Sequence, residues 1–267
     1  MPLFHLLLVA IIQGLTEFLP ISSSGHLILL PQVTGGPDQG LAIDVAVHVG
    51  TLFAVVMFFW SHVKQAVAGG INLLRGRLDA DGAHLALCLI IATIPAVLAG
   101  IVIKVTGLDA AMRSVAVIGW TMLVFGLVLY WADQRGGTQR AMQDWTITHA
   151  LWMGCAQCIA LIPGTSRAGI TITAGRLLGY GREGAATLSM LMSIPVILAS
   201  GLVLSVDVVQ DANWALARDA GIAAVFAFLA AIAALALMFR LLRAVSFTPY
   251  VIYRVVLGVI LLIWAYA

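Results

Sequence analysis

Long apolar runs dominate the chain, and four of them contain no charged residue over the length of a membrane-spanning helix. These runs are 85–103, 114–132, 184–206 and 220–239. Two further runs are as long, but 41–60 contains Asp44 and His48, and 248–267 contains Arg254. A helix needs about 20 predominantly apolar residues to cross a bilayer. The pattern therefore predicts an all-α integral membrane protein with six transmembrane helices.

Two more apolar stretches, 3–32 and 146–178, are interrupted near the middle by proline and small polar residues. The interruptions read LPISSSG from residue 19 and IPGTSRAG from residue 162. Pro20 and Pro163 each remove a backbone donor and disfavour helix at the preceding residue, so the chain must break there. Non-helical backbone at membrane depth is tolerated only where protein buries it or where it lines a wet cavity. We therefore expect two re-entrant helical hairpins whose tips point into the protein.

The two broken stretches indicate an internal repeat. A shift of 143 residues superimposes Pro20 on Pro163 and Ser23 on Ser166. Few residues are identical in this alignment, so its weight comes from position. Broken hydrophobic segments at matching places in two halves point to a binding site near the membrane midplane.

One membrane domain over 1–267 is expected, because no polar segment is long enough to form a soluble domain. Its pseudo-repeat halves, about 1–140 and 141–267, would each hold one re-entrant hairpin followed by three crossings. Three is odd, so the second half must be inverted relative to the first. The positive-inside rule places the basic loops in the cytoplasm and the acidic loop outside. The basic loops are 61–84, 133–146 and 240–247, and the acidic loop is 207–218.

Composition agrees with a membrane protein. Apolar residues make up 62% of the chain and charged residues 10%, against about 25% charged residues in soluble domains. The net charge of +2 is too small to indicate a nucleic-acid partner. Three cysteines are an odd number, so no disulfide framework is expected. The first 16 residues lack the basic start of a secretory signal peptide.

Glu17 and Arg167 are ionisable residues within the broken stretches, where such groups are costly and therefore functional candidates. Gln13 lies four residues before Glu17, on the same helix face. Glu17 can serve as a base, a metal ligand or the counter-ion of an arginine. The planar guanidinium of Arg167 can hold a phosphate at two points. A purely structural ion pair between Glu17 and Arg167 is the alternative.

Serines start a new helix after the first break. Ser22, Ser23 and Ser24 can cap its free N–H groups, and those same groups attract anions. Ser23 and His26 are three residues apart, a spacing that suits a nucleophile with its base. The alternative is that the serines only cap the helix and His26 only bonds a carbonyl.

The second break supplies groups of the same kind. Gly164 lets the backbone approach a ligand, and Ser166 and Thr171 offer hydroxyls. Two helix N-termini, one arginine and several hydroxyls suit an anion with many oxygens, which predicts a site for a lipid phosphate. We expect the substrate to be bound by Gln13, Ser22, Ser24, Gly164, Thr165, Ser166 and Thr171.

Two further sets of polar residues have weaker assignments. Asp44 and His48 lie four residues apart on the next helix, where they either line the same cavity or only pack. Glu183 follows Arg176 and Arg182 at a helix start, where we expect it to interact with the helix dipole.

The residues at the two breaks form recognisable motifs. Gln13-Gly-Leu-Thr-Glu17-Phe-Leu-Pro-Ile-Ser-Ser-Ser-Gly-His26 and Pro163-Gly-Thr-Ser-Arg167 resemble the two signature motifs of bacterial undecaprenyl-pyrophosphate phosphatases, the bacitracin-resistance family of membrane phosphatases. The resemblance covers essentially the whole chain in length and segment order. It implies hydrolysis of undecaprenyl diphosphate to the monophosphate and phosphate, which recycles the lipid carrier of peptidoglycan synthesis and confers bacitracin resistance. It also implies a multi-pass protein of the bacterial cytoplasmic (inner) membrane, with its active site open to the outer, periplasmic side.

The resemblance also implies a divalent cation, Mg²⁺ or Ca²⁺, which we expect to be bridged by the diphosphate and Glu17. The expected catalytic residues are Glu17, Ser23, His26 and Arg167. The first motif commonly begins with Glu or Gln; because Gln13 cannot act as a base, proton transfer should fall to Glu17 or His26. We favour Ser23, activated by His26, as the nucleophile, and direct attack by water with Glu17 as base stays open.

Two other classes of protein remain alternatives. Inverted repeats with broken helices also occur in secondary transporters, and a lipid-phosphate flippase would need a similar cavity. A membrane scaffold that binds the lipid without turnover is a third reading. Release of phosphate from a prenyl diphosphate discriminates among them. The expected partners are the polyprenyl diphosphate and membrane lipids, with a homodimer left open.

Overall fold

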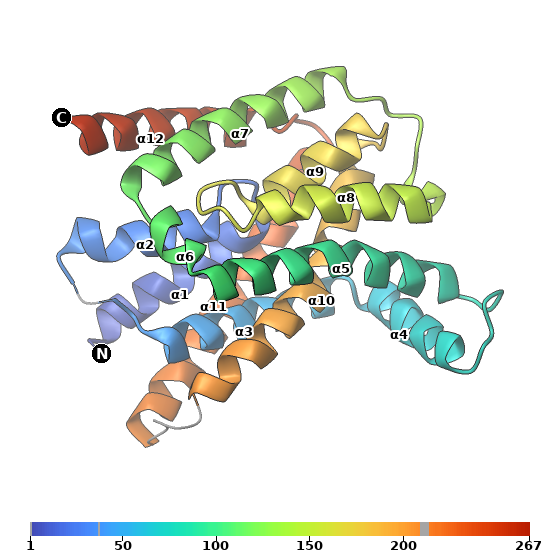
Figure 1. The fold of residues 1–267 in the computed structure, drawn as a ribbon, viewed down its shortest axis with the longest axis horizontal. Helices are drawn as coiled ribbons and strands as arrows, with labels where there is room; N and C mark the ends of the chain where they lie inside the picture. Colours follow the sequence, from blue (N-terminus) through green and yellow to red (C-terminus); the bar gives the residue numbers. More distant parts are fainter. Residues whose placement is uncertain (1, 37, 209–213) are drawn as a thin grey trace.

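The computed structural model describes residues 2–36, 38–208 and 214–267, and the regular elements of these residues are all helical (Figure 1). The first part of the chain forms α1 (Leu3–Phe18), α2 (Ser23–Thr34), α3 (Leu41–Phe58), α4 (Trp60–Leu74), α5 (Ala83–Thr106), α6 (Leu108–Met112) and α7 (Val115–Arg135). The second part forms the 3₁₀ helix η1 (Met142–Asp144), α8 (Ile147–Ile159), α9 (Arg167–Leu177), α10 (Arg182–Val208), α11 (Trp214–Leu242) and α12 (Thr248–Tyr266).

Six of the described helices, α3, α5, α7, α10, α11 and α12, are long and apolar enough to cross a membrane. They coincide with the six runs that the sequence predicts, so the prediction of an all-helical membrane protein is confirmed. Large apolar side chains on these helices are exposed, among them Phe53 (64%), Leu98 (58%) and Leu202 (70%). So much contiguous apolar surface suits lipid rather than water.

The segment 61–84, expected as a loop, instead contains α4. Phe59 leaves helical geometry at φ −104° and ψ 30° and separates α4 from α3. Val63 and Ala66 pack against the main hydrophobic core, and the backbone of Gly69 lies against the carbonyl of Gly82. This apolar face explains the helix, while the polar residues on its other positions explain why it is not a span.

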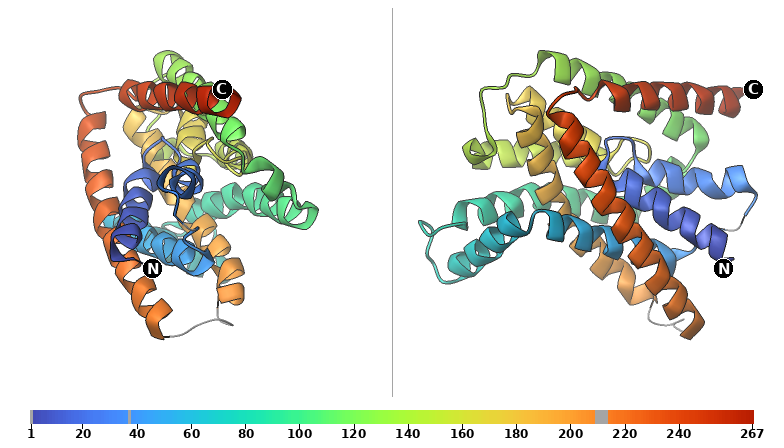
Figure 2. Two further views of the ribbon diagram at one scale, coloured as in Figure 1. Left: turned by 90° about the vertical axis from the view of Figure 1, so that its left-hand side faces the viewer. Right: turned by 180° about the vertical axis from the view of Figure 1, so that it is seen from behind.

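Helices α8 and α9 pack against each other in the middle of the molecule, where α9 also contacts α7 and α10 and α8 also contacts α5 (Figure 1). Figure 1 shows α7 and α12 side by side along one edge. In the right-hand view of Figure 2, which is seen from behind, α11 crosses α1 and α3. Small residues allow the closest approaches. The backbone of Gly14 on α1 meets Ala227 on α11, and that of Gly154 on α8 meets Ala92 on α5. These contacts fix α1 and α8, the two helices that lead into the chain breaks.

Candidate functional site

Both breaks in the chain lie where proline predicts them, and each ends at a serine in an unusual conformation. Helix α1 ends at Phe18 and α2 begins at Ser23, after Ser22 with φ +76°. Helix α8 ends at Ile159 and α9 begins after Ser166, with φ +71°. Among the described residues these two serines alone combine a side chain with positive φ. Such strain costs about 1–3 kcal/mol per residue and tends to gather at functional sites.

Ser22 and Ser166 cap the helices that follow the two breaks, and their spacing differs by one residue from the shift that aligns the two prolines. The Ser22 hydroxyl accepts the N–H of Gly25 at 3.3 Å, and the Ser166 hydroxyl accepts that of Gly169 at 3.1 Å. Equivalent caps are thus 144 residues apart rather than 143, because one extra residue separates the proline from the cap in the second break. Arg167 consequently occupies the helix position that matches Ser23, not that of Ser24.

Glu17 joins the two breaks through its carboxylate. Its Oε2 accepts the Ser23 hydroxyl at 2.6 Å and the Gln13 amide at 3.0 Å. Its Oε1 accepts the Arg167 guanidinium at 2.9 Å. Glu17 is buried, and the Arg167 side chain is 13% exposed. A cavity of about 170 Å³ opens beside Glu17, Arg167 and His48. The expected set of Gln13, Glu17, Ser23 and Arg167 therefore lies together.

His26 does not contact Ser23 in this arrangement. Its Nδ1 lies 2.6 Å from the Ser22 carbonyl, and its Nε2 lies 2.5 Å from the Tyr253 hydroxyl, with the two rings stacked. A carbonyl can only accept, so Nδ1 carries the proton and Nε2 accepts from Tyr253. The expected pairing of Ser23 with His26 is thus replaced by Ser23 with Glu17. The Ser22 carbonyl takes the Nδ1–H and the Tyr253 hydroxyl occupies the Nε2 lone pair, so neither ring nitrogen is left to accept a proton from Ser23.

Arg254 on α12 holds both breaks together. Its side chain is fully buried, and Nη1 donates to the Pro20 carbonyl at 3.2 Å. Nη2 donates to the carbonyls of Gly164 at 3.1 Å and Thr165 at 2.8 Å. Further donations reach two carbonyls of α7. All of these acceptors are neutral, and no ion pair of Arg254 is found in the described structure, so its charge adds positive potential beside the tips.

Gly164, Thr165 and Thr171, the other expected substrate ligands of the second break, lie against neighbouring helices. A side chain at Gly164 would meet Thr121 on α7, whose hydroxyl also donates to the Pro163 carbonyl at 2.6 Å. Thr171 bonds Ser189 on α10 at 2.6 Å. Thr165 is fully buried, and its hydroxyl has no hydrogen-bond partner in the part of the chain that the structure describes. Gly164 and Thr171 therefore help to fix the second break against α7 and α10, whereas the Thr165 hydroxyl is left unpaired.

Ser24, Asp44 and His48 line a second cavity of about 240 Å³ on the other side of the site. Asp44 accepts the Gln39 amide at 2.8 Å, and the His48 Nδ1 donates to the Asp44 carbonyl at 2.7 Å. The His48 Nε2 lies 4.0 Å from Glu17. His48 therefore borders both cavities, whereas Asp44 lines only the larger of these two.

No group of three or more His, Cys, Asp or Glu side chains among the described residues could hold a metal ion. Both Glu17 oxygens are occupied by hydrogen bonds. The residues present therefore do not form a metal site by themselves.

The sequence did not predict Tyr253 at this site, nor did it predict that Arg254 holds the two breaks together. Arg254 carried a signal, since it is a charged residue inside a predicted span, but its partners are carbonyls that leave no motif. Tyr253 precedes Arg254 on the same helix, α12, and carried no signal.

A multi-pass membrane protein with a buried carboxylate, arginine and serine between two helix tips belongs to the class of intramembrane proteins that handle phosphate esters. The family model described as "Bacitracin resistance protein BacA" matches residues 6–260. The chain therefore belongs to this family.

Curated relatives cover the whole chain. It is 67% identical to the protein named undecaprenyl-diphosphatase of Roseobacter denitrificans and 68% identical to that of Dinoroseobacter shibae, in each case over 100% of both chains. A protein of the same name from Chromohalobacter salexigens is 44% identical over 97% of this chain and 98% of its own.

Proposed function

We propose that this protein hydrolyses undecaprenyl diphosphate to undecaprenyl phosphate and inorganic phosphate within the membrane. Family membership and the names of full-length relatives support this activity. The observation that carries it here is the carboxylate of Glu17, which holds a serine hydroxyl on one oxygen and an arginine on the other. Those three groups are the base, the nucleophile and the anion ligand that phosphoryl transfer requires.

In the proposed reaction, Ser23 attacks the terminal phosphorus of the diphosphate while its proton passes to Glu17. The bond from that phosphorus to the bridging oxygen breaks, and undecaprenyl phosphate leaves. Water then attacks the phosphoserine, which releases phosphate and restores the hydroxyl. Water attack without a phosphoserine, with Glu17 again as base, is the alternative.

Charge explains how a diphosphate could be held at membrane depth. Arg167 would exchange its contact with Glu17 for phosphate oxygens and stabilise the charge that develops in the transition state. Arg254 adds a second buried positive charge behind both tips. The first turns of α2 and α9 direct N–H groups toward the same region. Gln13 and Ser22 then act as ligands of Glu17 and of the helix start rather than of the substrate.

A divalent cation would have to be shared with the diphosphate, because the described residues do not form a metal cage. Mg²⁺ keeps several waters and is commonly held by one carboxylate and substrate phosphates. When bound, such a cation would supply charge neutralisation between the diphosphate and Glu17. Chelator treatment followed by addition of Mg²⁺ or Ca²⁺ tests this, with activity unaffected by chelation as the contrary result.

The two broken stretches support an inverted repeat of re-entrant hairpins. Each pairs a proline break with a strained serine cap, and each is followed by three candidate spans. In this arrangement the site opens to the periplasmic side of the inner membrane, where the diphosphate left by peptidoglycan synthesis is recycled. More enzyme would then remove the lipid that bacitracin sequesters. A homodimer stays a prediction.

The direct test is phosphate release by the purified chain from undecaprenyl diphosphate in detergent. Release with saturation by the lipid supports the proposed activity. Binding without release would support a scaffold, and lipid transfer across vesicles without release would support a transporter or flippase. Glu17→Gln is the matched control, because it keeps the size of the side chain while removing the base.

A further inference from the structure

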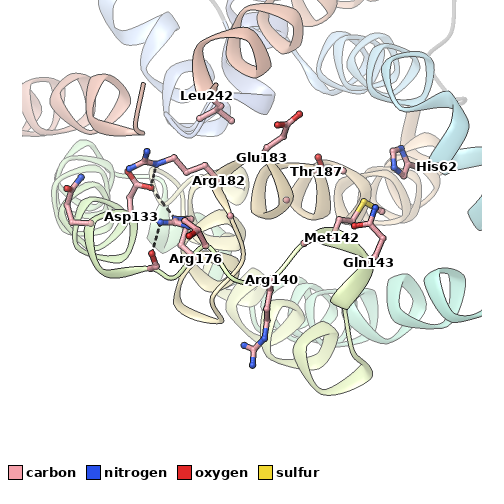
Figure 3. A pocket seen from close by; sticks show the side chains of 16 residues that line it. His62, Asp133, Arg140, Met142, Gln143, Arg176, Arg182, Glu183, Thr187 and Leu242 are labelled. Atoms are coloured by element: carbon pink, nitrogen blue, oxygen red, sulfur yellow. Dashed lines mark hydrogen bonds and ion pairs between the residues drawn. The ribbon is translucent and has the colours of Figure 1, made fainter. Parts of the chain in front are cut away.

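A second cluster of arginines lies at the other end of α9, around Asp133. The Asp133 carboxylate is buried, and its Oδ1 accepts the Nε of Arg176 at 3.2 Å and the Nε of Arg182 at 2.8 Å. Its Oδ2 accepts the backbone N–H of Phe247 at 3.3 Å. One carboxylate therefore serves two guanidinium groups, from α9 and from the start of α10 (Figure 3).

The two arginines differ in what they leave free. Arg176 is buried, and its remaining N–H groups donate to backbone carbonyls of Gly137, Tyr180, Asp133 and Gly136. Its role is to fix the backbone around the cluster. Arg182 is 35% exposed, and neither of its Nη groups has a hydrogen-bond partner in the part of the chain that the structure describes. Nε anchors this fork and leaves its two amino groups free.

Arg182 also lines a cavity of about 680 Å³ (Figure 3). Arg140 and the first residues of α10 also line this cavity. The unpaired N–H groups at the start of α10 add to the positive potential there. Glu183 is the other acidic residue of the lining, and Figure 3 shows its carboxylate directed away from the Arg182 guanidinium. Two buried or half-buried guanidiniums with one carboxylate leave a surplus positive charge that a second anion would neutralise.

We propose that this cavity binds a phosphate group, either the headgroup of an anionic lipid or free phosphate, with the Arg182 fork as its main ligand. Arg guanidinium groups bind phosphate oxygens in pairs, and the anchored Nε removes much of the entropy that a free side chain would lose. The cavity is separate from the site at Glu17. Arg176 lies nine residues along α9 from Arg167, which at 1.5 Å per residue is about 13 Å.

Arginine footprinting of the intact purified chain tests the proposal without a mutation. Phenylglyoxal modification would be followed by peptide mass spectrometry at Arg182, at Arg167 and at exposed Arg243, which lies outside the cavity lining. One arm adds inorganic phosphate against chloride at equal ionic strength. The other compares phosphatidylcholine nanodiscs with and without phosphatidylglycerol.

Slower modification of Arg182, by about threefold or more at ligand concentrations above Kd, with Arg243 unaffected, supports the site. Protection by phosphate alone identifies the free ion, and protection by phosphatidylglycerol alone identifies a lipid headgroup. Unchanged modification of Arg182 in both arms, or equal slowing at Arg243, overturns the proposal.

A pair of variants provides a second readout. Arg182→Gln should lose the protecting ligand, measured as anionic lipid or phosphate retained in native mass spectrometry, whereas Arg243→Gln should retain it. Equal retention by the two variants would contradict the assignment to Arg182. If Arg182→Gln does not fold, the footprint of the parent protein decides alone.

Discussion

The Ser23 hydroxyl lies 2.6 Å from the Glu17 carboxylate, although the two residues belong to different helices on either side of a proline break. This is the length of a charge-assisted O–H···O⁻ hydrogen bond. Glu17 can therefore receive the serine proton without rearrangement. Arg167 lies 2.9 Å from the other carboxylate oxygen, so the anion ligand is already beside the nucleophile.

Arg167→Lys should be severely impaired, because an ammonium cannot replace the planar fork that holds a phosphate at two points. Loss of one transition-state donor typically costs about 100-fold or more in turnover. The measurement is phosphate release at saturating lipid, with exposed Arg243→Lys as the matched control. Turnover near that of the parent protein would remove the argument for a bidentate arginine.

Arg254→Lys should lower both thermal stability and turnover. The lysine keeps the charge but loses most of the donations to Pro20, Gly164 and Thr165, and each buried carbonyl left without a donor costs about 1–3 kcal/mol. Unfolding in detergent measures the stability, and turnover well below the unfolding temperature measures the position of the tips. A destabilised variant with parent-like turnover when folded would show that Arg254 supports the fold alone.

His26 and Tyr253 should have unequal effects. Tyr253→Phe removes the partner of Nε2 but leaves the Nδ1 bond to the Ser22 carbonyl, so turnover should stay within about threefold, the effect of roughly 0.6 kcal/mol. His26→Ala removes the donor to the strained Ser22 carbonyl and should cost about tenfold, the effect of roughly 1.4 kcal/mol. Equal damage by the two variants would indicate that the tyrosine takes part in the reaction.

The chain breaks and the six spans could be predicted from the sequence, because proline and charge-free length act locally. Pro20 and Pro163 fix the breaks whatever their surroundings. That His26 bonds a carbonyl was one of two alternatives from the sequence, and the choice between them could not be predicted because it depends on the backbone of Ser22, whose positive φ is imposed by the tertiary structure. The spacing of Ser23 and His26 is correct for one helix face, yet a nearer carbonyl takes the imidazole.

The spacing of the two serine caps and the role of Arg254 could not be predicted from the sequence, for different reasons. The two serine caps align only when one extra residue is allowed in the second break, and too few identities surround it to show this. Arg254 acts through backbone carbonyls, which carry no sequence information.

The inverted repeat predicts opposite sides for two loops. In a chain without its native cysteines, Asp79→Cys in the loop after α4 should react with an impermeant thiol reagent only from the cytoplasm. Asp211→Cys should react only from outside; this position lies outside the described residues, and the prediction rests on loop charge. Labelling of both positions from the same side would exclude the inverted arrangement.

The central claim is that Ser23 is the nucleophile of a lipid diphosphate phosphatase and that Glu17 is its base. Its most direct test is phosphate release from undecaprenyl diphosphate by the Ser23→Ala protein relative to the parent. We predict a loss of about 1,000-fold or more, because the covalent route is removed. A Ser23→Ala enzyme within about tenfold of the parent would have lost only a phosphate hydrogen bond of roughly 1.5 kcal/mol, and would contradict the account.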